Sequence, residues 1–251
     1  MIKSLFYFLL ALLITLSSCS SEEKNSDLIL PQTINYIDIK TSTDSLVKVS
    51  YDGNKIKSLI GEGGRIEFEY EGDFIIKQTR YFKKEGKDVK NDEYSYSYKN
   101  DKLFLETHIE GSHKQTRLFT YNDNGTVDVK INSFYSNGQE REEKEEYTFV
   151  NGNLIKVTYN HNQDSMGELK FEYDTKSNPF KNVLGYKLLM HGSYSIFINN
   201  IVEVTSTDIF KGSVLNTRNY KTEYIYNNQG YPVKMTSNLI LPNKIIEYSY
   251  K

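Results

Sequence analysis

Cysteine is almost absent from this sequence, since Cys19 is the only one among 251 residues. A single cysteine cannot form a disulfide within the chain, and it excludes a structural zinc site made of several thiolates. The segment around Cys19 marks it as a lipid attachment site, so it is not a candidate nucleophile. We therefore expect the fold to be stabilised by apolar burial and backbone pairing alone.

Neither sign of charge dominates, because 31 basic residues are balanced by 33 acidic ones. Capture of nucleic acid needs a clustered basic excess, so we expect no nucleic acid partner. Beyond the N-terminal segment, no apolar run approaches the roughly 20 residues that a membrane-spanning helix needs. Tryptophan is absent, which weakens a role in stacking on sugars.

The most specific pattern in the sequence is at its N-terminus. Lys3 precedes an apolar run that ends at Leu16 and leads through two serines to Cys19. A cationic start, a short apolar segment and small residues before a cleavage point are typical of a secretory signal. A cysteine at that point is what a lipoprotein signal peptidase requires, because the thiol receives a diacylglycerol before cleavage. We predict a signal peptide over residues 1–18, cleavage between Ser18 and Cys19, and lipidation of Cys19.

The segment after the expected cleavage point is small, polar and acidic, and it begins with Ser20, Ser21, Glu22 and Glu23. Such a composition buries little surface, so we expect residues 19–33 to form a lipidated, flexible tether. An acidic run directly after the acylated cysteine resembles the export signal of surface lipoproteins in Bacteroidota-type bacteria. The resemblance implies an outer-membrane lipoprotein on the cell surface, with the periplasmic face as the alternative.

The rest of the chain repeats one unit, in which a strand-like segment ends on an aromatic residue and a turn follows. Residues 66–70 (Ile-Glu-Phe-Glu-Tyr) show the alternation that gives a strand one buried face. Asn-Gly, Asp-Gly or Asn-Asp pairs then supply the positive-φ positions of a tight hairpin turn. The terminal aromatic residues of the units are Tyr51, Tyr70, Tyr98, Tyr121, Phe149, Tyr173, Tyr226 and Tyr250.

Counting such segments between Ile34 and Tyr250 gives about 16 strands, at roughly 12 residues per strand and turn. Consecutive hairpins predict an all-β fold, an antiparallel up-and-down meander. A round barrel of this size leaves a water-filled lumen, whereas the apolar face needs cover. We therefore expect a flattened barrel or a strongly curled sheet, formed by a single domain over residues 34–251. Its buried face should hold the rings of Tyr70, Tyr98, Tyr121 and Tyr173.

One segment resembles a known family. It reads aromatic-Asp-x-Lys-x-Asn-Pro-Phe, with the defining residues Asp174, Lys176, Asn178, Pro179 and Phe180. Together with the Asn-Asn-Ile motif at residues 199–201 and the hairpin repeat, it is similar to Bacteroidota lipoproteins of unknown function described as having a porin-like β-fold. The resemblance implies a fold, a lipoprotein anchor and a surface or periplasmic location. It implies no catalytic residue, since the family carries no established activity.

The chemistry of the same segment is that of a strand terminator. The Asp174 carboxylate can accept hydrogen bonds from backbone N–H groups just ahead, Pro179 cannot donate to a strand ladder, and Phe180 can fold back onto the core. A ligand-binding loop is the alternative interpretation. Residues 182–191, which follow, fit a strand and a short helix equally.

Signatures of catalysis are missing from the sequence. It has four histidines, none at a metal-ligand spacing such as His-x-x-x-His: His108, His113, His161 and His191. We expect His108 to face solvent from its strand. No Gly-x-Ser-x-Gly elbow is present, and the glycine-rich run at residues 61–64 lacks the lysine and the helix of a phosphate loop. We predict no catalytic residue, no cofactor and no metal ion.

Two function classes remain. The first is a non-catalytic outer-membrane or cell-surface lipoprotein with a binding or structural role, whose partners are the membrane, through its anchor, and a protein or a glycan. The second is a secreted hydrolase that acts on glycans or peptides with a pair of carboxylates, a pair that the sequence alone cannot single out. A membrane-spanning barrel fits poorly, because its strands would be interrupted by Lys77, Arg80, Lys130 and Lys156.

Overall fold

The computed structural model of the protein describes residues 28–160, 164–189, 198–238 and 244–251. These residues form sixteen strands and one short 3-10 helix, η1 (Tyr186–Leu188). No helix in this described part is long and apolar enough to cross a membrane. The strands are β1 (Pro31–Asp38), β2 (Thr43–Asp52), β3 (Lys55–Gly61), β4 (Gly64–Glu71), β5 (Phe74–Lys84), β6 (Lys87–Lys99), β7 (Lys102–Glu110), β8 (His113–Tyr121), β9 (Thr126–Phe134), β10 (Glu140–Val150), β11 (Asn153–Asn160), β12 (Ser165–Ser177), β13 (Asn199–Phe210), β14 (Ser213–Tyr226), β15 (Pro232–Ser237) and β16 (Lys244–Tyr250).

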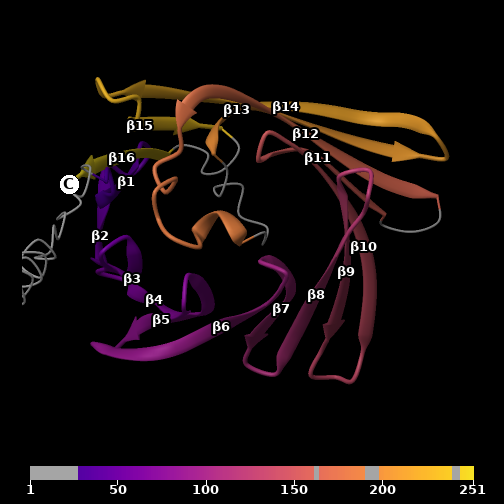
Figure 1. Ribbon diagram of the computed structural model, residues 1–251, viewed down its shortest axis with the longest axis horizontal. Helices are drawn as coiled ribbons and strands as arrows, with labels where there is room; N and C mark the ends of the chain where they lie inside the picture. Colours follow the sequence, from indigo (N-terminus) through magenta and orange to yellow (C-terminus); the bar gives the residue numbers. More distant parts are fainter. Residues whose placement is uncertain (1–27, 161–163, 190–197, 239–243) are drawn as a thin grey trace, which may run out of the picture.

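The strands form one closed barrel (Figure 1). Each strand pairs antiparallel with its neighbours in the sequence, and β1 pairs with both β2 and β16, which closes the ring. The predicted all-β fold, an antiparallel up-and-down meander of about 16 strands, is confirmed, and it takes the form of a barrel instead of an open curled sheet. The first strand begins at Pro31, so residues 31–33 belong to the barrel and not to the expected tether.

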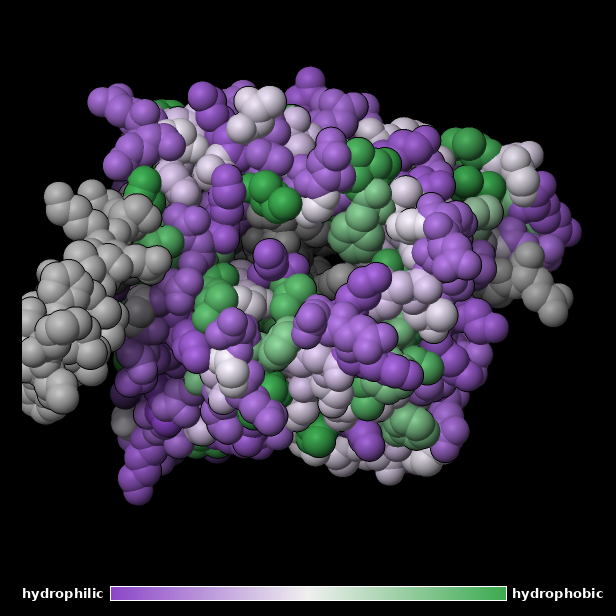
Figure 2. Space-filling model, viewed as in Figure 1, coloured by the Kyte–Doolittle hydropathy of each residue, from purple (hydrophilic) through white to green (hydrophobic). Residues whose placement is uncertain are grey.

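Alternation along each strand separates an inner from an outer face of the barrel. In β4, Phe68 and Tyr70 belong to the apolar core, whereas Glu67 and Glu69 point outward. This is the pattern of a strand with one buried face. In the space-filling view, hydrophilic side chains cover most of the visible face of the molecule, and apolar side chains form scattered patches (Figure 2).

The two ends of the barrel differ. One end collects the turns that follow the terminal aromatic residues of the even-numbered strands, such as the turn between β6 and β7 at Asn100 and Asp101. We call it the plugged end, because the connection between β12 and β13 folds into the ring there (Figure 1). The described residues 178–189 of this connection, which include η1, form the plug. We call the opposite end of the barrel the far end.

The plug supplies the apolar cover that the inner face needs. Tyr186 stacks on Phe180 with 4.9 Å between ring centroids, and Phe68 of the barrel wall lies 6.4 Å from Tyr186. Val183 and Leu189 are only 3% and 2% exposed. These side chains pack against the apolar inner face of the barrel at the plugged end and shield it from water.

The terminal tyrosines connect neighbouring hairpins. As predicted, the rings of Tyr70, Tyr98, Tyr121 and Tyr173 pack against the buried core. The alternation does not reveal what their hydroxyl groups do, which is to donate to carbonyl oxygens of a neighbouring segment. In five cases the donation, over 2.6–3.0 Å, crosses to the preceding strand of the barrel: Tyr51 to Pro31, Tyr98 to Ile75, Tyr121 to Leu103, Tyr173 to Leu154 and Tyr250 to Pro232. In β14 it is Tyr224, two residues before the terminal Tyr226, that donates to the preceding strand, to Ile201 at 3.0 Å.

Candidate functional site

Toward the far end, the inner face of the barrel changes from apolar to charged. Two of the inward carboxylates are almost fully buried, since Asp92 is 1% and Glu106 2% exposed. Buried charges are costly unless they are paired, so such a group is either a structural network or a binding site. We call this region the polar lumen, and its residues include Arg80, Asp92, Tyr94, Glu106, His108, Glu110, Arg117 and Glu145.

Arg80 and Asp92 form a two-pronged ion pair between β5 and β6. Arg80 Nε and Nη2 each donate to one Asp92 carboxylate oxygen at 2.6 Å. Asn91 Nδ2 donates to Asp92 Oδ2 at 2.8 Å, and the Arg80 guanidinium lies 5.2 Å from the centroid of the Tyr94 ring. The Asp92 carboxylate therefore has a fixed orientation and a compensated charge.

A second charged group surrounds Arg117 in β8. Arg117 Nε lies 3.9 Å from Glu106 Oε1, and Arg117 Nη1 lies 3.9 Å from Glu145 Oε2. The Tyr147 hydroxyl donates to Glu145 at 2.6 Å. Burial raises the pKa of Glu106 to about 7, although the Arg117 charge acts in the opposite direction. Glu106 is therefore a carboxyl group that titrates near neutral pH.

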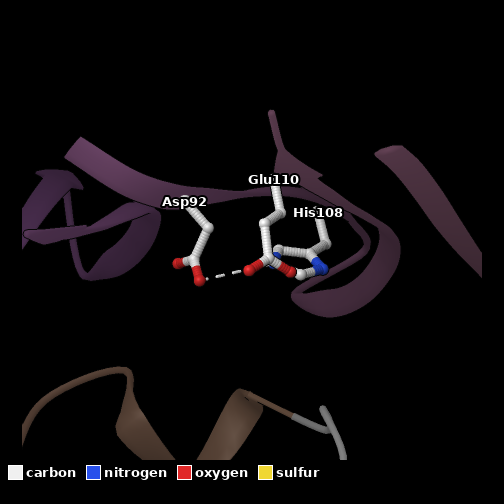
Figure 3. A group of neighbouring side chains, drawn as sticks. All are labelled: Asp92, His108 and Glu110. Carbon is white, nitrogen blue, oxygen red and sulfur yellow. Dashed lines mark ion pairs between the residues drawn. The ribbon is translucent and has the colours of Figure 1, made fainter. Parts of the chain in front are cut away.

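Asp92, His108 and Glu110 are the one group of three side chains, within the described part of the chain, that could hold a metal ion (Figure 3). Their ligand atoms all lie within 4.8 Å of one another. The His108 ring stacks on Tyr94 with 4.2 Å between centroids. Burial lowers the pKa of His108, partly opposed by the Asp92 charge, so the imidazole is neutral at neutral pH. A neutral imidazole with two carboxylates suits a divalent metal ion.

The expectation that His108 faces solvent is wrong. Glu106, His108 and Glu110 alternate along β7 and point to one side, and that side is the lumen, because Glu106 is paired in register with the buried Tyr96. The His108 side chain is only 12% exposed. A spacing such as His-x-x-x-His cannot reveal this group, since its members come from β6 and β7. The available signal is the Glu-x-His-x-Glu alternation on one face of a predicted strand.

The segment that carries the family resemblance begins near the end of β12. Asp174 Oδ1 accepts hydrogen bonds from Lys176 N at 2.9 Å and from Asn200 N at 3.1 Å. The Tyr226 hydroxyl donates to Asp174 Oδ2. The Lys176 side chain is exposed. These contacts join Asp174 to the backbone just ahead of it and to the strands β13 and β14.

The same segment continues into the plug. Asn178 Oδ1 accepts a 3.0 Å hydrogen bond from Phe180 N, across Pro179. The Phe180 ring packs against the core, as the strand-terminator interpretation requires. Of the undecided residues 182–191, those up to 189 form turns and η1, and the last two lie outside the described residues.

The predicted lipidation site also lies outside the described residues, together with the rest of the cleavage and export segment: Ser18, Cys19, Ser20, Ser21, Glu22 and Glu23. The same holds for His161 and His191. What the sequence indicates for these residues stays a prediction.

The sequence matches no known family model and no curated protein. Among solved structures, the chain is similar to a porin-like protein from Bacteroides uniformis, with 11% sequence identity and a TM-score of 0.49. The similarity covers 88% of this chain and 98% of that protein. The β-barrel that the family resemblance implies is confirmed by the strand pairing of the chain itself.

Proposed function

We propose that this protein is a lipid-anchored outer-membrane lipoprotein, exposed at the cell surface, whose barrel stands in water and has a non-catalytic binding role. The observation that carries the proposal is the outer face of the barrel. Lys77 pairs there with Glu69 at 3.4 Å and with Glu93 at 3.3 Å, and Lys130 pairs with Glu142 at 2.8 Å. A lysine on the lipid face of a barrel costs about 2–4 kcal/mol at the bilayer midplane, so a surface rich in such pairs favours water as its surroundings.

One of the four basic residues that the sequence offers against a membrane-spanning barrel, Arg80, does not lie on the outer face. Arg80 points into the lumen, where it pairs with Asp92, so it says nothing about the outer surface. Lys77 and Lys130 do point outward and support the argument. With a charged outer face, the barrel would be held at the membrane by the proposed lipid on Cys19. Residues 20–30 would span at most about 40 Å when extended, enough to hold the barrel clear of the headgroups.

The polar lumen supports a binding role. The plug fills one end of the barrel, so charged and hydrogen-bonding side chains are concentrated toward the far end. Two of them are incompletely satisfied, because the buried Nε2 atoms of His108 and His113 make no hydrogen bond to any described group. Native proteins leave few buried polar atoms without a partner, and those that remain are often explained by water, an ion or a ligand.

A solubility experiment tests whether the barrel is surrounded by water and not by lipid. The chain from residue 20 onward, purified without detergent, should be monodisperse in size-exclusion chromatography and show a β-rich circular dichroism spectrum. Aggregation that only detergent prevents, with a folded barrel recovered in micelles, would support a membrane-spanning barrel and overturn the proposal.

One observation favours a hydrolase as the second candidate. Glu106 has a pKa raised to about 7, and Glu145 lies on the other side of Arg117, so two carboxylates of different environment face one lumen. Glu106 is 2% exposed, which limits its access to a substrate. A screen with glycan and peptide substrates should give no turnover. Turnover that Glu106→Gln abolishes, with the circular dichroism spectrum unchanged, would establish the enzyme instead.

A further inference from the structure

We propose that Asp92, His108 and Glu110 bind one divalent transition-metal ion, of which Zn²⁺ is the representative, in the polar lumen. The inference depends on the inner face of the barrel alone, and not on lipid anchoring or on the absence of catalysis. A failure of either part of the proposed function would therefore leave it standing.

The strand register brings the three ligands together. Asp92 of β6 is directly opposite Glu110 of β7, and Tyr94 is directly opposite His108, so all three ligands are on the inner face within two adjacent strands. His108 Nε2 lies 3.7 Å from Asp92 Oδ2. Because zinc bonds to nitrogen and oxygen are about 2.0–2.2 Å long, two ligands of one ion lie up to about 4 Å apart. The separation therefore suits two ligands of one ion.

The state of His108 points to a missing partner. Its Nε2 atom is buried and forms no hydrogen bond to any group in the described ranges. At 3.7 Å the Asp92 oxygen is too far away to serve as one. The ring is nevertheless held in place, because it stacks on Tyr94 with an interplanar angle of 11°. An oriented imidazole with an unsatisfied nitrogen beside two carboxylates is what a metal ion would complete.

The ion pair with Arg80 is compatible with this role. Asp92 accepts two hydrogen bonds from the Arg80 fork and one from Asn91 Nδ2. A carboxylate has about four lone-pair positions, so one remains for a metal ion, on Oδ1, and binding through Oδ2 would displace the Asn91 amide. Outer hydrogen-bonding partners of this kind commonly orient the ligands of a metal site. Glu110 is exposed, so it lies on the solvent side of the group and gives an ion a route to it. The donor set contains no thiolate, which favours Zn²⁺ or Mn²⁺ over Cu⁺.

Metal titrations of the full chain, purified in mild detergent and freed of metal with a chelator, test the proposal. Isothermal titration with Zn²⁺ should show one site, and histidine-selective ¹⁵N spectra should show a shift of one imidazole nitrogen. His108→Ala and Glu110→Gln should each weaken binding by at least about 100-fold. Glu110→Gln is the more informative variant, because its side chain is exposed and its replacement leaves the buried Arg80–Asp92 pair in place.

A matched carboxylate serves as the control. Glu140, at the start of β10, is an exposed glutamate at the same end of the barrel and lies outside the group of three. Glu140→Gln should bind Zn²⁺ within about threefold of the unmodified chain. Failure of the unmodified chain to bind Zn²⁺ or Co²⁺ up to about 1 mM would overturn the proposal. Binding that survives both His108→Ala and Glu110→Gln would also overturn it, since the ion would then sit elsewhere.

Discussion

The hydroxyl group of Tyr98 donates a 2.7 Å hydrogen bond to the carbonyl oxygen of Ile75, which belongs to the preceding hairpin. The ladder between β5 and β6 ends at the pair Lys77 and Ser95, so the Ile75 carbonyl lies beyond the last strand pair. The tyrosine thus extends the pairing of two hairpins by a side-chain bond where backbone bonds have stopped. A barrel without disulfides gains a repeated connection in this way.

Tyr98→Phe should therefore lower the free energy of unfolding by about 1–2 kcal/mol, because a partly buried carbonyl loses its donor. Urea unfolding followed by circular dichroism measures the change. Tyr135→Phe is the control, because Tyr135 is 41% exposed in the connection between β9 and β10, and its effect should stay within about 0.5 kcal/mol. Equal losses in both variants would contradict a specific role for the Tyr98 hydroxyl.

Gly185 fixes the plug against the barrel wall. It has a φ of +72°, and a Cβ added there would lie 2.8 Å from the carbonyl oxygen of Asp73. Gly212 has a similar φ of +78°, but a Cβ there would meet nothing within 4 Å. Both alanine variants incur the cost of a left-handed backbone, roughly 1–2 kcal/mol, and only Gly185→Ala adds a clash.

Gly185→Ala should consequently destabilise the protein by about 1–3 kcal/mol more than Gly212→Ala. The denaturant midpoints of the two variants, compared at equal slope, measure this difference. If the two variants unfold at the same midpoint, the plug is free to move away from Asp73.

The barrel could be predicted from the sequence because each strand carries its own signal. Residues 66–70 alternate strictly between apolar and acidic side chains, and this alternation has one structural meaning, a strand with one buried face. The plug could not be predicted in the same way. Residues 182–189 have no clear period, and their turns and short η1 depend on contacts with distant segments, such as the bond from Leu184 N to Asn54 O.

The candidate site could not be predicted from the sequence for a related reason. Polar residues on an alternating strand are normally assigned to solvent, so the sequence places His108 on the outer face. The assignment fails because the lumen changes from apolar to charged along its length. Local alternation indicates which residues share a face, but it does not indicate which face lies inside the barrel. Only the pairing of Glu106 with the buried Tyr96 decides the question.

The raised pKa of Glu106 predicts that the barrel loses stability as the pH rises. The folded state has a pKa of about 7, above the ordinary value of 4.5. Between these values the folded protein keeps a proton that the unfolded chain has released, so each increase in pH favours unfolding. The contribution of Glu106 to the free energy of unfolding is therefore complete below pH 4.5. It is lost as the pH rises through 7, and the loss amounts to about 3 kcal/mol at most.

Glu106→Gln removes this titration, so the free energy of unfolding of the variant should depend less on pH between about 5 and 8. Urea unfolding of both chains in the presence of a chelator measures the difference. The pH profile of the variant is subtracted from that of the unmodified chain, because other charged groups, His108, Arg117 and Glu145, lie in the same lumen. Of these, His108 has a pKa that burial lowers. Identical profiles would contradict a protonated Glu106 in the folded protein.

Cys19 should be the lipidated N-terminus of the mature protein, because it follows a cationic start, an apolar run and two serines. Mass spectrometry of the mature N-terminus should find a diacylglycerol on Cys19. Cys19→Ser should leave the chain unprocessed or release it from the membrane, since anchoring needs more than one acyl chain. Ser17→Ala, which keeps a small residue before the cleavage point, should be processed normally.

The double variant Glu22→Ala and Glu23→Ala tests the export signal: an added protease should digest the unmodified protein on intact cells and leave the variant protected. Digestion of both proteins would show that surface exposure does not depend on the acidic run. An unmodified Cys19 in the mature protein would contradict the predicted lipid anchor.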